Sequence, residues 1–136
     1  MSIKKTYGLI GKNIDYSFSV KYFSQKFNDE KIIDSEYLNF DLREIEDFNN
    51  LEILKINGLN VTIPYKEKII TYLDEVDKAA NKIGAVNTIA KKDDKLIGYN
   101  TDYIGFIKSF KNNLNFKNAL ILGTGGASKA IQYALN

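Results

Sequence analysis

The sequence predicts an α/β fold: a mostly parallel mixed sheet flanked by helices, followed by the truncated start of a Rossmann-like domain. Two patterns indicate this fold class. Apolar runs of strand length alternate with amphipathic stretches of helix length along most of the chain. Near the end, a glycine-rich segment at residues 123–127 separates an apolar run from an amphipathic stretch. The order strand, glycine turn, helix is typical of a dinucleotide-binding unit.

The first part of the chain predicts strands and helices in alternation. Short apolar runs predict strands at 6–11, 36–41 and 57–61. Longer amphipathic stretches predict helices at 20–27, 44–54, 64–73 and 76–83. Pro64 suits the first turn of its predicted helix, where the missing N–H would have no intrahelical partner.

The next segment predicts a β-hairpin. Residues 85–91 and 95–100 flank the short polar turn Lys92-Asp93-Asp94. An antiparallel hairpin beside parallel strands makes the predicted sheet mixed. Residues 102–113 alternate apolar and polar positions at helical spacing, so we expect a helix there and place the domain boundary near it.

The glycine-rich segment predicts a phosphate-binding turn. The apolar run at 119–122 predicts a fully buried strand, and residues 127–135 predict a helix packed against it. Glycines allow a tight turn, and the following helix N-terminus offers N–H groups and a positive dipole to a pyrophosphate. A P-loop is excluded, because Lys129 lies between Ser128 and Ala130 instead of between glycine and serine or threonine. A purely structural glycine turn stays open as the alternative.

This dinucleotide-binding unit is expected to be incomplete. Residues 117–136 are fewer than the roughly 30 or more residues of a full βαβ unit. The second strand of such a unit carries the side chain that distinguishes NAD from NADP. The turn alone therefore leaves both cofactors open.

Composition favours a globular protein with a small-molecule ligand. The 136 residues are 44% hydrophobic and 12% aromatic, which is enough for one buried core. A net charge of +2 without a basic block argues against nucleic acid. Cysteine and histidine are absent, so we expect no disulfide and no metal site, and acid–base chemistry falls to Lys, Asp, Glu or Tyr. Without a long apolar run or a signal-peptide pattern, we expect a cytoplasmic monomer or homodimer that binds no membrane.

Polar residues gather just after the predicted strands. They are Ser17 and Ser19 after the first strand, Asn60 and Thr62 around the third, and residues 100–102 after the hairpin. Ligands of open α/β sheets bind outside the carboxyl ends of the strands, so these side chains are expected to line one pocket. Hydroxyl and amide groups suit a polyhydroxylated substrate, although each residue alone is as easily a helix cap or a turn residue.

Lys66 and Asp102 form a candidate proton-transfer pair. Lys66 is predicted in the first turn of a helix, where a cation opposes the helix dipole, and such violations concentrate at functional sites. A solvated surface lysine is the alternative, and Asp102 is equally explained as a helix N-cap. Together at one pocket edge, an ammonium and a carboxylate could pass a proton to or from a substrate oxygen.

Five motifs in this order resemble the shikimate dehydrogenase family. They are residues 8–11 with Ser17-Phe18-Ser19, residues 60–66, residues 84–88, residues 100–106 and residues 123–127. The resemblance covers essentially the whole chain and about the first half of the family's usual length. It implies three parts: a shikimate-binding domain at 1–101, an interdomain helix and linker at 102–116, and an incomplete NADP-binding Rossmann domain at 117–136.

The resemblance implies an NADP-dependent oxidoreductase that reversibly reduces 3-dehydroshikimate to shikimate in aromatic amino-acid (chorismate) biosynthesis. By positional match, the catalytic pair is Lys66 and Asp102. The matched substrate-binding residues are Ser17, Ser19, Asn60, Thr62, Lys66, Asn87 and Asp102. The matched cofactor-binding residues are Gly123, Gly125, Gly126 and Ala127. NAD is not excluded.

Two residues depart from the family's usual pattern, and two other hypotheses of function stay open. Val20 stands where the family usually has proline, and Phe23 where it usually has histidine, so the choice between shikimate and quinate is open. Because the cofactor unit is incomplete, we expect little dehydrogenase activity from these 136 residues alone. The alternatives are a non-catalytic ligand-binding or assembly module of the same fold, and a related two-domain dehydrogenase for another small carbonyl compound.

Overall fold

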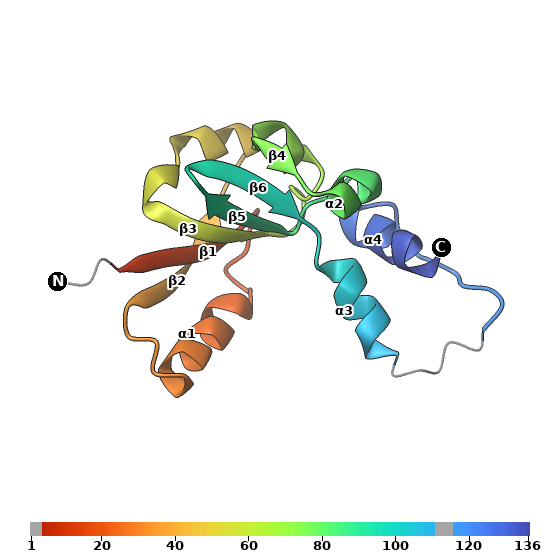
Figure 1. Cartoon of the computed structure of the whole chain (residues 1–136), viewed down its shortest axis with the longest axis horizontal. Helices are drawn as coiled ribbons and strands as arrows, with labels where there is room; N and C mark the ends of the chain where they lie inside the picture. Colours follow the sequence, from red (N-terminus) through yellow and green to blue (C-terminus); the bar gives the residue numbers. More distant parts are fainter. Residues whose placement is uncertain (1–3, 111–115) are drawn as a thin grey trace.

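The computed structural model describes residues 4–110 and 116–136, and it contains one mixed sheet with helices on its faces and at one end (Figure 1). The six strands are β1 (Lys5–Gly11), β2 (Ser35–Asp41), β3 (Ile56–Val61), β4 (Glu75–Val76), β5 (Thr88–Lys92) and β6 (Lys95–Tyr99). The α-helices are α1 (Ser19–Asp29), α2 (Lys78–Ile83), α3 (Asp102–Ser109) and α4 (Gly126–Leu135). Three short 3₁₀ helices span Ile45–Asn50, Ile53–Lys55 and Lys68–Tyr72.

The sheet confirms the predicted fold class. Its strand order is β2-β1-β3-β5-β6-β4. β1 is parallel to β2 and β3, and β4 is parallel to β6, whereas β5 is antiparallel to both β3 and β6. The carboxyl ends of β1, β3 and β6 therefore share one edge, and Figure 1 shows α2, α3 and α4 grouped beyond that edge.

The predicted hairpin is also confirmed. β5 and β6 pair from Thr88 opposite Tyr99 to Lys92 opposite Lys95, so the turn consists of Asp93 and Asp94. Both aspartates have positive φ, 49° and 61°, which is what a two-residue turn between twisted antiparallel strands requires. Aspartate tolerates this conformation better than most residues, which explains why the sequence turns there.

β1 is buried on both faces. Ile10 belongs to the larger core cluster together with Val61, Val86 and Ile89, whereas Leu9 points to the opposite face and packs with Tyr37 under α1. Successive side chains of a strand point to opposite faces, so a strand covered on both sides has a continuous apolar run. β1 is accordingly an interior strand, between β2 and β3.

Two predicted helices were wrong in type. The segments at 44–54 and 64–73 contain only 3₁₀ helices instead of α-helices, and the Ile63–Pro64 peptide bond is cis, so Pro64 does not begin a helix. In the first segment, Asn49-Asn50 are weak helix formers at the point where the 3₁₀ turn ends. In the second, Tyr65 and Ile69 are both buried, so core packing decides the backbone path.

Two predicted boundaries need correction. Val76 lies in β4, and α2 begins only at Lys78, because the Asp77 side chain caps it by accepting a hydrogen bond from the Ala79 N–H at 2.9 Å. Gly84, with φ 72°, ends α2. α3 ends at Ser109, and the rest of its predicted range falls partly in residues 111–115, outside the described residues.

The predicted buried strand at 119–122 was wrong. The structure has no strand there, and Leu120 and Leu122 are 85% and 88% exposed. A strand needs a neighbouring strand to satisfy its backbone N–H and C=O groups, and the described sheet supplies none beside this segment. The helix that follows is confirmed as α4, which packs on the α2 and α3 end of the molecule through buried Ala130 and through Tyr133 against Tyr103. None of the described helices is long and apolar enough to cross a membrane.

Candidate functional site

The centre of the site is an ion pair between Lys66 and Asp102. Lys66 follows β3, and Asp102 begins α3 directly after β6, so the shared strand edge brings them together. The Lys66 Nζ and Asp102 Oδ2 atoms are 2.7 Å apart, and the side chains are only 15% and 33% exposed. Asn87, just before β5, donates from Nδ2 to Asp102 Oδ1 at 2.8 Å. Both carboxylate oxygens of Asp102 are thus held by hydrogen-bond donors, and the Lys66 ammonium keeps two further N–H groups for a ligand.

Asp102 is held in place by a buried asparagine. Asn100 is 3% exposed, and its Oδ1 accepts the Asp102 backbone N–H at 3.0 Å while its Nδ2 donates to the Ala85 carbonyl at 2.9 Å. The N-cap of α3 is Thr101, and Asp102 is the first helical residue. The structure therefore does not support the alternative that Asp102 is the helix N-cap. Asn100 accepts the Asp102 backbone N–H, and the carboxylate is available to Lys66.

Lys66 lies in a loop and not in a helix. The 3₁₀ helix begins two residues later, at Lys68, so the expected opposition between the lysine charge and a helix dipole is absent. The Lys66 carbonyl accepts the Val86 N–H at 2.7 Å, which ties the loop to the segment before β5. The lysine is thus positioned by tertiary contacts and by Asp102.

Asn87 connects the pair to the remaining polar residues. Its Oδ1 accepts from the Thr101 N–H at 2.8 Å and from the Thr88 hydroxyl at 3.1 Å, and its own amide nitrogen faces Asp102. These acceptor and donor contacts fix which way the amide points. Asn87 therefore presents its donor group to the carboxylate.

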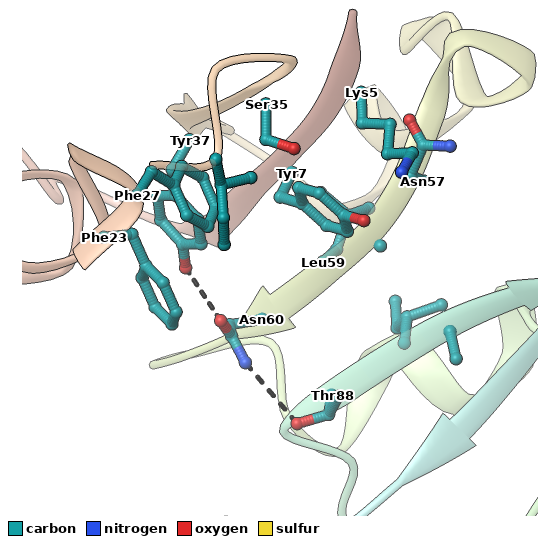
Figure 2. Close-up of a pocket in the computed structure, with 14 residues that line it drawn as sticks. Lys5, Tyr7, Phe23, Phe27, Ser35, Tyr37, Asn57, Leu59, Asn60 and Thr88 are labelled. Carbon is teal, nitrogen blue, oxygen red and sulfur yellow. Dashed lines mark hydrogen bonds between the residues drawn. The ribbon is translucent and has the colours of Figure 1, made fainter. Parts of the chain in front are cut away.

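A second amide continues this network into the sheet. The Tyr37 hydroxyl donates to Asn60 Oδ1 at 2.8 Å, and Asn60 Nδ2 lies 3.4 Å from Thr88 Oγ1, as the dashed lines in Figure 2 mark. Together with Asn87, these contacts form a directional chain of hydrogen bonds from Tyr37 to Asp102. The sequence analysis did not find Tyr37 or Thr88, because a tyrosine and a threonine inside strands are typical core and sheet residues.

Tyr37 is kept neutral by its surroundings. It is 5% exposed, and its ring stacks on Phe23 with ring centroids 4.3 Å apart. Burial raises the pKa of Tyr37 to about 12, and a hydrogen bond with the Ser19 side chain opposes that rise. Tyr37 thus stays protonated, and able to donate to Asn60, to a higher pH than an exposed tyrosine, and Ser19 lies beside it.

The other predicted substrate residues lie at the same edge with local contacts. Ser17 Oγ accepts the Ser19 N–H at 3.2 Å in the turn that leads into α1. The Thr62 N–H donates to the Ile10 carbonyl at 2.8 Å where β3 ends. Within the part of the chain that the structure describes, hydrogen bonds join Asn60, Asn87, Lys66 and Asp102, whereas the side chains of Ser17 and Thr62 bond directly to none of these four.

The glycine turn lies against this site. Gly125 is the N-cap of α4, and a side chain added there would meet no atom within 4 Å, so the turn is open to an approaching group. Gly123 has φ 128°, a conformation that favours glycine. With Gly126 and Ala127 as the first residues of α4, backbone N–H groups point toward the turn, where they could bind an anion.

A separate apolar pocket of about 510 Å³ lies between α1 and the sheet (Figure 2). Tyr7, Phe27 and Leu59 line it, and Asn60 and Thr88 form a polar part of its wall. Lys66 and Asp102 do not line it. This apolar pocket is therefore a neighbour of the ion pair and not its location.

A lysine–carboxylate pair at the carboxyl edge of an α/β sheet, next to a glycine turn that opens a helix, is typical of proteins that hold a small substrate beside a dinucleotide. Residues 9–89 match the family model of the shikimate dehydrogenase substrate binding domain. The chain belongs to this family.

Curated relatives agree with the family match. A shikimate dehydrogenase (NADP(+)) of Clostridium botulinum (strain Hall) is 52% identical over 136 residues, which cover 96% of this chain and 52% of that protein. A shikimate dehydrogenase (NADP(+)) of Bacillus anthracis is 44% identical over 140 residues, with 98% and 50% covered. The chain spans about half the length of the curated relatives it matches.

Solved structures have the same fold. Shikimate dehydrogenase 1 of Peptoclostridium difficile superposes with a TM-score of 0.84 at 42% identity, covering 96% of this chain and 52% of that chain. The enzyme of Thermus thermophilus, solved in complex with shikimate, gives 0.83 at 29% identity, with 96% and 52% covered. A shikimate dehydrogenase solved in complex with NADP+ gives 0.83 at 40% identity, with 97% and 48% covered.

Proposed function

We propose that this chain forms the substrate-binding half of an NADP-dependent shikimate dehydrogenase, which reversibly reduces 3-dehydroshikimate to shikimate in aromatic amino-acid biosynthesis. The observation that carries the proposal is the Lys66–Asp102 ion pair, with Asn87 on the second carboxylate oxygen. The names of the relatives support the reaction, and the relatives solved with shikimate and with NADP+ support the two ligands.

In this proposal, Lys66 is the proton donor and acceptor. During reduction, the Lys66 ammonium donates a proton to the oxygen of the ring ketone as that oxygen gains negative charge. In the reverse direction, the neutral amine takes the proton of the substrate hydroxyl. Asp102 stays ionised, holds Nζ at 2.7 Å and balances the charge of the ammonium. Bound NADP supplies or accepts the hydride.

The remaining polar residues orient the substrate. We assign the carboxylate and ring hydroxyls of shikimate to Ser17, Ser19, Asn60, Thr62 and Asn87, because hydroxyl and amide groups donate to and accept from such oxygens. Asn60 uses Oδ1 for Tyr37 and one N–H for Thr88, which leaves its second N–H as a donor for the ligand. The site thus offers donors at several points of one edge.

The glycine turn is the proposed binding site of the cofactor diphosphate. The open space at Gly125, the left-handed backbone at Gly123 and the N-terminus of α4 fit a phosphate that approaches the backbone closely. Gly126 and Ala127 contribute backbone N–H groups in the first turn of the helix. The domain division at 1–101, 102–116 and 117–136, the cytoplasmic location and the choice between monomer and homodimer stay predictions.

A shikimate titration of the 136-residue chain tests the proposal. We expect backbone amide NMR shifts at Ser17, Asn60, Lys66 and Asp102, with cyclohexanecarboxylate, which lacks the ring hydroxyls, giving much smaller shifts. Unchanged amide signals at all four residues at saturating shikimate would contradict the proposed substrate.

A related reductase is the second candidate. A 5-ketofructose reductase of Gluconobacter superposes with a TM-score of 0.81 at 29% identity, covering 97% of this chain and 49% of that chain. The same fold therefore accommodates another polyhydroxylated carbonyl compound. Adding 5-ketofructose and quinate to the titration distinguishes these substrates, because the true ligand shifts the four amides at the lowest concentration.

A further inference from the structure

Gly126 lies directly against the side chain of Lys66. A Cβ atom added at Gly126 would be 2.9 Å from Lys66 Cβ, 3.3 Å from Lys66 Cδ and 3.1 Å from Ala85 Cβ. Contacts under 3.0 Å essentially do not occur for real Cβ atoms, so a larger residue at this position would displace the lysine or the helix. Gly126 is the first residue of α4.

The backbone conformation does not explain the glycine. Among the described glycines, positive φ values occur at Gly84 and Gly123, and Gly126 has an ordinary helical conformation that any residue adopts. An alanine there would favour the helix. The close approach of Lys66, and not the backbone conformation, is therefore what requires a glycine at position 126.

Neighbouring contacts prevent the two segments from moving apart. Lys129 of α4 forms an ion pair with Glu67, the residue after Lys66, with Nζ and Oε2 2.5 Å apart. Ala130 is completely buried against the α2 and α3 end of the molecule. Both contacts lie within the four residues after Gly126 and hold the start of α4 beside Lys66. An added methyl group would therefore press on the Cβ atom of Lys66 and shift the lysine side chain.

We propose that Gly126 is a positioning residue for Lys66: its bare Cα lets the lysine stem lie where Nζ reaches Asp102 and the substrate. This inference rests on the proposed function. It gives Gly126 a role toward the substrate in addition to any contact with the cofactor diphosphate. The turn proposed for the cofactor and the group proposed for proton transfer are thereby in van der Waals contact.

Shikimate binding without cofactor separates the two roles of Gly126. We expect Gly126→Ala to weaken shikimate binding to the chain by about tenfold or more in calorimetric titrations, because a displaced Lys66 ammonium loses its charge-assisted hydrogen bond to the substrate. Gly105→Ala is the matched control, since Gly105 is a glycine of α3 with no atom within 4 Å of an added Cβ. That control is expected to bind within about twofold of the wild-type chain.

A double-mutant cycle with Lys66→Gly, which removes both the ammonium and the crowded Cβ atom, shows whether the effect passes through the lysine. With the ammonium removed, Gly126→Ala should cause no further loss of shikimate affinity, whereas independent effects would add. If Gly126→Ala alone does not fold, the Gly126→Ala, Ala85→Gly variant removes the second crowded methyl group and leaves only Lys66 in close contact.

The outcomes distinguish this inference from the proposed function. If the wild-type chain binds shikimate and Gly126→Ala binds it within twofold, the positioning role is wrong and the proposed function stands. A further tenfold loss in the Lys66→Gly background also overturns the positioning role. If the wild-type chain does not bind shikimate, the proposed function itself fails.

Discussion

Two apolar segments of the chain have similar sequences and different structures. Leu9-Ile10 of β1 and residues 119–122 are both short apolar runs followed directly by a glycine, Gly11 in one case and Gly123 in the other. In β1, Leu9 and Ile10 are buried between α1 on one face and the larger core on the other. In the second segment, Leu120 and Leu122 are exposed and have no strand beside them in the described structure.

The difference shows that neighbouring strands, more than local sequence, make an apolar run into a strand. β1 pairs with β2 and β3 along its length, which satisfies its backbone groups on both sides. Its carboxyl end is one of those that meet at the edge beside Lys66 and Asp102. Where the sheet behind the site is complete, hydrogen bonds join Asn60 and Asn87 to Asp102 by way of Thr88. The glycine turn is instead held through α4, by helix packing and by the ion pair between Lys129 and Glu67.

The largest expected effect comes from removing Lys66, the proposed proton-transfer group at the end of the complete sheet. In an enzyme that joins this chain to a complete cofactor domain, such as that of the Clostridium botulinum relative, Lys66→Ala should lower kcat by about 10²- to 10⁴-fold. The KM for shikimate should change less, because hydroxyl and amide contacts remain. Steady-state reduction of NADP+ by shikimate measures both values. Lys68→Ala, an exposed lysine two residues on, is the control, and kcat values alike in both variants would refute the role of Lys66.

Replacing an apolar side chain by alanine in β1 and in residues 119–122 tests the comparison between these two segments directly. Ile10→Ala should lower the free energy of unfolding by about 2–5 kcal/mol, because it leaves a cavity at a fully buried position. Leu122→Ala should change it by less than about 0.5 kcal/mol, because the side chain is already in solvent. Urea denaturation of the 136-residue chain gives both values. A loss above 2 kcal/mol for Leu122→Ala would mean that residues 119–122 are packed after all.

The same comparison explains how much of the fold could be predicted. β1, β2, β3 and the hairpin were predicted because their apolar runs lie in a sheet whose strands are all present in the described chain. The strand at 119–122 was wrong because sequence periodicity does not reveal whether a partner strand is present. The helices at 44–54 and 64–73 were wrong in type because buried residues such as Phe48 and Ile69 follow the core surface and not helical propensity.

The candidate site was predictable where the sequence places polar residues after strands. The structure brings Lys66, Asp102, Asn87 and Asn60 together, although the dipole argument for Lys66 was wrong. The alternative explanation of Asp102 as a helix N-cap is not supported, because the N-cap is Thr101. Their catalytic and binding roles, and those of the glycine turn, stay predictions. Tyr37 was missed because only the folded structure shows that a buried strand tyrosine directs its hydroxyl to Asn60.

Replacing Asn100, which accepts the backbone N–H of Asp102, has an intermediate expected effect. Asn100→Ala should lower the free energy of unfolding by about 1–3 kcal/mol, since it leaves the Ala85 carbonyl and the Asp102 N–H without their partner in a buried place. Chemical denaturation measures the change. Asn50→Ala, at an exposed position, should stay within about 0.5 kcal/mol. Equal values for the two variants would show that Asn100 does not support the site.

The smallest expected effect is a pH dependence that originates at Tyr37. Burial raises the pKa of Tyr37 from 10.0 to about 12, so the folded state favours the neutral phenol. Its contribution to stability is fully present below pH 10 and is lost as pH rises toward about 12. The phenolate that forms also cannot donate to Asn60, so the hydrogen-bond chain toward Asp102 loses its first donor.

Denaturation of wild type and Tyr37→Phe across this range isolates the effect, because burial also raises the pKa of Tyr65 and that contribution is common to both proteins. We expect the wild-type chain to lose more stability than Tyr37→Phe over this interval. Parallel curves of stability against pH would mean that Tyr37 is no more protected from solvent than a surface tyrosine. The end of the sheet that carries Tyr37 would then be as open to solvent as the glycine turn.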